Sequence, residues 1–215
     1  MKRAISVRFL PEIIILACLA ILLPIAVEAI EYPLPADQVD QAFSLGRTTD
    51  HNELAGFLSA YQHDFQSPPD QPRAYVKSIE LETPYEQVVL KSMHVPEYDR
   101  SRAEEDYQEN GGKIIVRAVV TLTLGYGIGI PTDDDDFAFT VSQGSRIEPQ
   151  ETNMTVLCNP LNPFAIYPVE PCVVYLREYL LRFNEGQFGR GKVTVKVKMP
   201  GGKSVETKFD LDKLK

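Results

Sequence analysis

The sequence predicts a mainly β domain of the α+β class: an antiparallel β-sandwich preceded by one or two short N-terminal helices. Polar and apolar residues alternate over 193–197 and over 205–211, which is the two-residue period of strands with one buried face. Pro200, Gly201 and Gly202 separate these two segments and predict a β-hairpin. Strand-like segments elsewhere follow one another without the alternating helices of a parallel sheet, so antiparallel sheets are expected.

The helices are expected near the start of the chain. Residues 37–45 and 50–65 each place apolar residues at helical spacing. Asp50 and the glutamate three residues later have the spacing of a capping box, which favours a helix beginning there. We expect residues 30–72 to form a helical segment that packs on a β-sandwich domain over 73–215.

Most of the remaining chain is expected to form strands. Residues 173–183 have the Val and Tyr content of a strand but also fit helical spacing, and we favour a strand because the neighbouring segments are strands. The charged segment 97–110 is expected to hold a short exposed helix around 102–109 or a loop. The strands expected before the hairpin are 74–83, 86–95, 114–130, 137–141, 155–157, 164–167 and 173–183. Seven or eight such strands favour an immunoglobulin-like sandwich, although the chain lacks the Trp of true immunoglobulin domains.

Residues 1–29 have the three parts of a secretory signal peptide. A basic head precedes an apolar run over 13–27, and Val27 and Ala29 stand three and one residues before the expected break. Cleavage after Ala29 predicts an extracytoplasmic protein, which is periplasmic, held in the cell envelope or secreted.

Two other fates of this segment stay open. The apolar run could remain as a membrane anchor, although Pro24 interrupts it and a spanning helix needs about 20 apolar residues. Cys18 could carry a lipid, although the Leu usually found three residues earlier is Ile15 here. We therefore expect cleavage.

Cleavage would also change the cysteine count. It would remove Cys18 and leave Cys158 and Cys172, an even pair in an oxidising compartment. We predict a disulfide between them, since neither a Cys-x-x-Cys motif nor a nearby second pair favours redox or zinc chemistry.

The charge of the chain bears on its partners. The net charge is −8, and loss of the signal peptide makes it one unit more negative. An acidic chain without a basic cluster is expected to bind neither nucleic acid nor an anionic lipid surface. Membrane contact is expected only through the N-terminal segment, if that segment is retained.

Few residues suggest chemistry. Asp133, Asp134, Asp135 and Asp136 are candidate calcium ligands, but the EF-hand spacing fails because Gly144 stands where a bidentate Glu is needed. We interpret the four as a solvated turn. The glycines over 125–129 lie within a strand pattern rather than before a helix, so close packing is a better interpretation than a phosphate site. No metal site is predicted, and no cofactor.

No catalytic motif is present in the sequence: neither a Gly-x-Ser-x-Gly elbow nor a His-Glu-x-x-His pair occurs. We therefore expect a non-enzymatic binding or structural and assembly domain, with an unidentified protein or envelope component as its partner. One alternative is an envelope hydrolase with dispersed acidic residues, and another is a domain presented at a membrane by its retained N-terminal segment.

Overall fold

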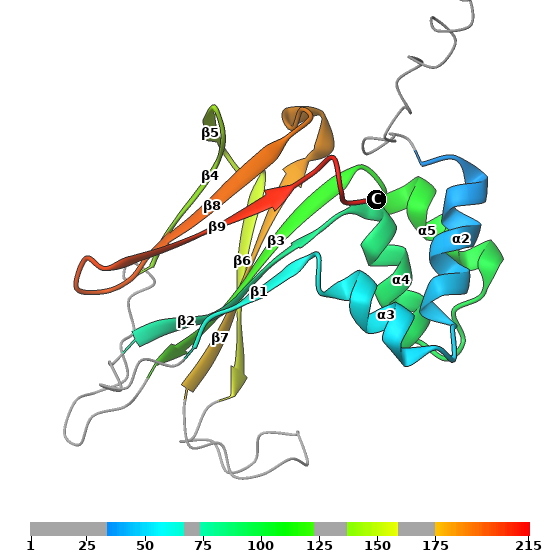
Figure 1. Ribbon diagram of the computed structural model, residues 1–215, viewed down its shortest axis with the longest axis horizontal. Helices are drawn as coiled ribbons and strands as arrows, with labels where there is room; N and C mark the ends of the chain where they lie inside the picture. The colour runs from blue at the N-terminus through cyan, green and yellow to red at the C-terminus, as the bar shows by residue number, and fades with distance from the viewer. Residues whose placement is uncertain (1–33, 67–73, 123–136, 159–174) are drawn as a thin grey trace, which may run out of the picture.

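The computed structural model describes residues 34–66, 74–122, 137–158 and 175–215. Helices gather at one end of the strands (Figure 1). They are α2 (Ala36–Gly46), α3 (His51–Leu58), α4 (Pro84–His94) and α5 (Arg100–Asn110). No helix in the described ranges is long and apolar enough to cross a bilayer.

The strands form two antiparallel sheets in the described part of the chain. The five-stranded sheet has the order β1 (Gln62–Asp64), β2 (Ala74–Glu82), β3 (Lys113–Leu122), β7 (Tyr175–Asn184) and β6 (Glu151–Cys158). The four-stranded sheet has the order β5 (Ser145–Ile147), β4 (Ala138–Gln143), β8 (Lys192–Lys198) and β9 (Ser204–Asp210). A short 3-10 helix, η3 (Glu185–Gln187), leads out of β7. The predicted mainly β, α+β chain with antiparallel sheets is confirmed.

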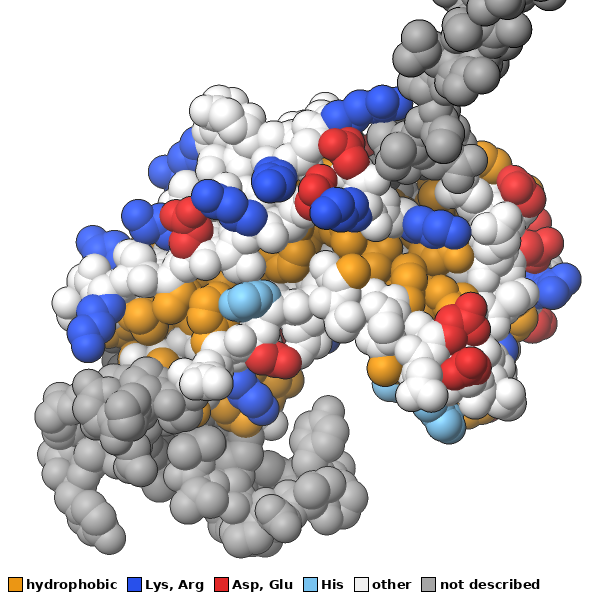
Figure 2. All heavy atoms as spheres, viewed as in Figure 1, with side chains coloured by type: hydrophobic (Ala, Val, Ile, Leu, Met, Phe, Trp, Pro, Cys, Tyr) orange, Lys and Arg blue, Asp and Glu red, His pale blue; other side chains and the backbone are white. Residues whose placement is uncertain are grey.

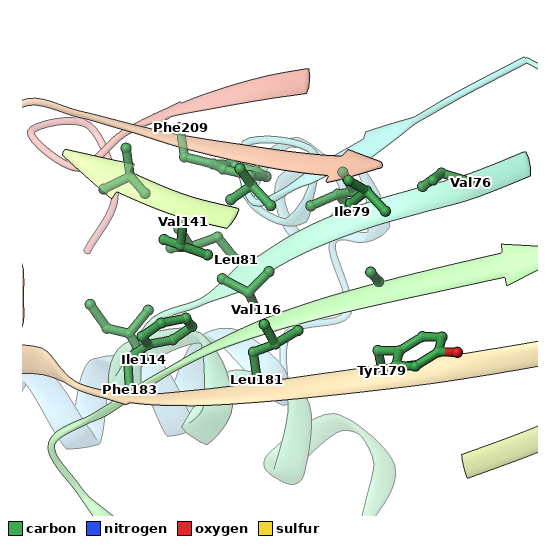
Figure 3. Packing of buried hydrophobic residues seen from close by; sticks show 14 of the residues in the cluster. Val76, Ile79, Leu81, Ile114, Val116, Val141, Tyr179, Leu181, Phe183 and Phe209 are labelled. Atoms are coloured by element: carbon green, nitrogen blue, oxygen red, sulfur yellow. The ribbon is translucent and has the colours of Figure 1, made fainter. Parts of the chain in front are cut away.

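One apolar core lies between the inner faces of the two sheets (Figure 3). Val116 of β3 and Leu181 of β7 belong to the same cluster as Val141 of β4 and Phe209 of β9. Each such side chain contributes about 1.5–3 kcal/mol when it leaves water. A second apolar cluster, which includes Tyr85, joins the helices. The sheets therefore share one core, and the helices carry a core of their own.

The predicted strand over 86–95 is wrong, because this segment lies in helix α4. Thr83 caps the helix by accepting a hydrogen bond from the Glu86 backbone N–H at 3.3 Å, and Pro84 occupies the first turn, where its missing N–H costs nothing. Tyr85, Val88 and Val89 then share the buried face at helical spacing. The Val content suggested a strand, but the cap and the spacing decide the helix.

The structure shortens one predicted helix and decides between strand and helix for another segment. The helix expected over 50–65 ends at Leu58, and residues 62–64 form β1, which pairs with β2. The strand preferred over 173–183 is confirmed by β7, which pairs with β3 along its whole length. The hairpin of β8 and β9 is likewise confirmed.

Helices α2 and α4 are in close contact at Gly46. A Cβ at this position would overlap the Ser92 hydroxyl and the Val89 carbonyl oxygen. Ser92 cannot easily move, because it is fully buried and donates to Val89 at 2.9 Å. The close packing of these helices therefore requires glycine.

Gly46→Ala is accordingly expected to lower the free energy of unfolding by about 2 kcal/mol, as overpacked sites do. Urea denaturation measures the loss. The matched control is Gly56→Ala in α3, where a Cβ meets no atom within 4 Å and the gain in helix propensity should leave stability equal or higher. Equal effects of the two substitutions would contradict the close approach.

Candidate functional site

Three glutamates converge on Arg117 at the outer face of the five-stranded sheet. Arg117 in β3 lies opposite Glu80 in β2, and its guanidinium contacts that carboxylate at 3.2 Å. It also contacts Glu82, two residues along β2, at 2.6 Å and Glu178 of β7 at 2.9 Å. The period of two in each strand places all four side chains on one face. The fork of donors on a guanidinium allows one arginine to hold several carboxylates.

Burial shapes the acidity of this cluster. The Glu82 side chain is only 4% exposed, and Glu80 is 16% exposed. Burial, followed by the charge of Glu82, raises the pKa of Glu80 to about 7 against the opposing effect of Arg117. Burial also raises the pKa of Glu82, while Arg117 lowers it. The cluster therefore contains a carboxyl that titrates near neutral pH.

A fourth glutamate, Glu86, lies beneath the first turn of α4. It is fully buried, and neither of its carboxyl oxygens has a hydrogen-bond partner within the described residues. Burial first, and then the charges of Glu80 and Glu82, raise the pKa of Glu86 to about 10. Glu86 is therefore a neutral acid at pH 7, sealed from solvent.

A pocket of about 520 Å³ opens in the helical layer. Its carboxylates are already engaged: Asp40 lies 3.8 Å from Arg100, and Glu53 accepts a hydrogen bond from Thr48 at 3.4 Å. The Lys215 ammonium lies 5.5 Å from the centre of the Tyr85 ring. The lining residues are Asp40, Gln41, Ser44, Leu45, Thr48, Glu53, Tyr85 and Lys215. The glutamates around Arg117 are not among them.

Most candidate residues from the sequence lie outside the described residues. These are the signal peptide with its cleavage after Ala29, the glycines over 125–129, Asp133, Asp134, Asp135, Asp136 and Cys172. Cys158 ends β6, so the disulfide with Cys172 stays a prediction. Among the residues that the structure describes, no group of three or more His, Cys, Asp or Glu is placed to hold a metal ion.

The structure also brings together basic residues that the sequence analysis did not connect. The outer face of the four-stranded sheet carries Lys192, Lys196 and Lys198 on β8, together with Lys208 on β9. Arg146 on β5 joins the same face opposite Ser142. In Figure 2, Lys and Arg side chains follow β8 and β9 with some Asp and Glu side chains among them, and further Asp and Glu side chains lie at the helical end. The sequence pattern that could have predicted this basic face is the alternation of Lys with Val in β8. The net negative charge of the whole chain does not report such a local cluster.

No protein-family model matches this chain, and no curated protein matches it. A function must therefore be argued from the chemistry of its sites, because a fold alone does not define one.

Proposed function

We propose that this protein is an exported, non-enzymatic binding or structural and assembly domain. The observation that carries the proposal is that the converging carboxylates are either paired with an arginine or buried. Glu80, Glu82 and Glu178 hold one guanidinium, and Glu86 is sealed beneath α4. A general acid or base must reach a substrate proton, and none of these groups lines the pocket in the helical layer.

The proposed architecture is an immunoglobulin-like sandwich. Two antiparallel sheets share one core, and the chain passes between them after β3, β5 and β7. Such sandwiches commonly serve in recognition and assembly, which supports a binding role by analogy only. Helices α4 and α5, inserted between β2 and β3, form a helical layer with α2 and α3, and the pocket of this layer is lined mainly by residues of α2.

Export rests on the N-terminal segment. A basic head, an apolar run over 13–27 and the small residues before the break favour cleavage after Ala29. The mass of the protein recovered from an exporting host measures this directly. A chain that begins at Ile30 is expected. A chain that keeps residues 1–29 would instead support the membrane-presented form.

One observation favours a second candidate function, an envelope hydrolase. Asp40 and Glu53 line the same pocket, and paired carboxylates are the requirement for glycoside hydrolysis. Against this, the Asp40 side chain is 55% exposed, whereas the general acid of a glycosidase has its pKa raised by an apolar setting. The exposed setting is better suited to binding than to catalysis.

The two functions predict different results in one assay. We expect the wild-type protein to release no chromophore above background from nitrophenyl glycosides and esters between pH 5 and pH 8. A variant with Asp40→Asn and Glu53→Gln should give the same background, as should the control Asp37→Asn, which lies on α2 outside the pocket lining. Turnover that only the double variant abolishes would establish the hydrolase instead.

A further inference from the structure

The outer face of the four-stranded sheet is a basic surface. Lys192, Lys196 and Lys198 are exposed on β8, and within the described ranges no carboxylate lies within 4 Å of any of their ammonium groups. The strand period places Lys196 and Lys198 about 7 Å apart along β8, and Lys192 about 13 Å from Lys196, because Thr194 occupies the outward position between them. These three residues, called the lysine row below, form no ion pair within 4 Å, although Glu206 lies directly across from Lys196 and Asp210 directly across from Lys192.

The acids on this face are already engaged. Glu206 lies 3.6 Å from Lys208, and Asp210 lies 3.7 Å from Lys213. Arg146 contacts Glu148 at 2.7 Å. The remaining outward positions on β4, β8 and β9 are small: Ala138, Thr140, Ser142, Thr194 and Ser204. The face therefore presents positive charge over a surface without projecting apolar side chains.

The shape of this face decides which anion it suits. The described pocket of about 520 Å³ lies in the helical layer, away from β8 and β9. An acidic peptide or polysaccharide would be held best by a groove or by aromatic rings, and neither lies among the outward residues of this face. Exposed ammonium groups outside the described pockets instead match the phosphates of a lipid surface. We propose that the lysine row docks this sheet on an anionic phospholipid surface.

The net negative charge of the chain does not prevent this contact. The helices that carry many of the acids stand at one end of the sheets (Figure 1). At physiological ionic strength the field of an exposed charge falls off within about 8 Å, so a surface responds mainly to the charges that face it. The proposal rests on export, because that route brings the chain to membrane surfaces. A lysine row alone gives weak, reversible binding that orients the domain.

Vesicle sedimentation tests the proposal with the protein purified from an exporting host. We expect binding to vesicles that contain phosphatidylglycerol, none to phosphatidylcholine alone, and loss of binding in about 1 M salt, where screening acts within about 3 Å. Each lysine should contribute roughly five-fold to the partition coefficient, so Lys196→Gln with Lys198→Gln should lower it roughly 25-fold. The matched control, Lys77→Gln with Lys113→Gln on the five-stranded sheet, should change it little.

Several results would overturn the inference. These are no binding of the wild-type protein to the anionic vesicles, equal binding by the two double variants, or lysine-dependent binding to soluble polygalacturonate without binding to vesicles. The mass of the isolated chain tests export separately from the vesicle assay. Failure of the docking proposal can therefore be distinguished from failure of the proposed function. Circular dichroism of both variants confirms that neither loses its fold.

Discussion

Glu86→Gln is expected to stabilise the protein at pH 8 by roughly 3 kcal/mol and to leave its stability at pH 4 nearly unchanged. The pKa of Glu86 is about 10 in the folded protein, against an ordinary value of 4.5. Between these values the folded state holds a proton that the unfolded state releases. Stability therefore decreases as the pH rises from about 4.5 towards 10. Gln resembles the protonated acid in shape and has no proton to release, so it removes this penalty.

Urea denaturation of both proteins between pH 4 and pH 9 measures the effect. The difference in unfolding free energy should widen steadily with pH. Glu104→Gln on α5 serves as the control, because Glu104 is exposed and its replacement should shift the curve little at any pH. Parallel curves for Glu86→Gln and the wild-type protein would show that Glu86 is ionised and solvated in the folded state.

Two opposing effects on Glu86 determine whether its carboxyl is charged in the folded protein. It lies in the first turn of α4, where a negative charge is favoured by up to about 2 kcal/mol through the helix dipole. Full burial of an unpaired carboxylate costs several kcal/mol more than that. Burial therefore dominates, and the acid stays protonated under the helix.

The same local signals explain what could be predicted from the sequence. The hairpin of β8 and β9 was predictable because each arm alternates strictly and the turn between them is rich in glycine. Helix α4 was not predicted, because the Val and Leu content of 86–95 was given more weight than the cap formed by Thr83 and Pro84. In this segment, the residues that begin a helix carry more information than strand propensity.

The carboxylate cluster could not be predicted in the same way. Glu82, Arg117 and Glu178 belong to three strands, and they meet only because β3 lies between β2 and β7 in this register. Strand order depends on long-range packing that no local pattern reports. The lysine row differs, because the alternation in β8 already places its residues on one face, although the net charge of the chain is negative.

Arg117→Met is expected to lower the free energy of unfolding by about 3 kcal/mol at pH 8, and by less at pH 5. Met fills much of the space of the arginine stem, so the loss reports the guanidinium. Without it, Glu80, Glu82 and Glu178 would repel one another in a partly buried site. Because Arg117 itself is about one third exposed, we place the loss at the lower end of the range for buried pairs.

The pH dependence separates this explanation from a simple loss of packing. Acid protonates Glu80 and Glu82, whose pKa values are raised, and weakens the repulsion, so the penalty of Arg117→Met should shrink as the pH falls below the pKa of Glu80, about 7. Arg182→Met on β7 is the comparison: it breaks an exposed pair with Glu151 and removes a more distant charge that lowers the pKa of Glu82, so its loss should be smaller and should change less with pH. The loss of unfolding free energy for Arg117→Lys should lie between the losses for Arg117→Met and Arg182→Met. The ammonium keeps the positive charge, but it lacks the planar fork of donors that lets a guanidinium contact three carboxylates. If Arg117→Met costs no more than Arg182→Met at pH 8, the glutamates are solvated individually and the cluster does not act as a unit.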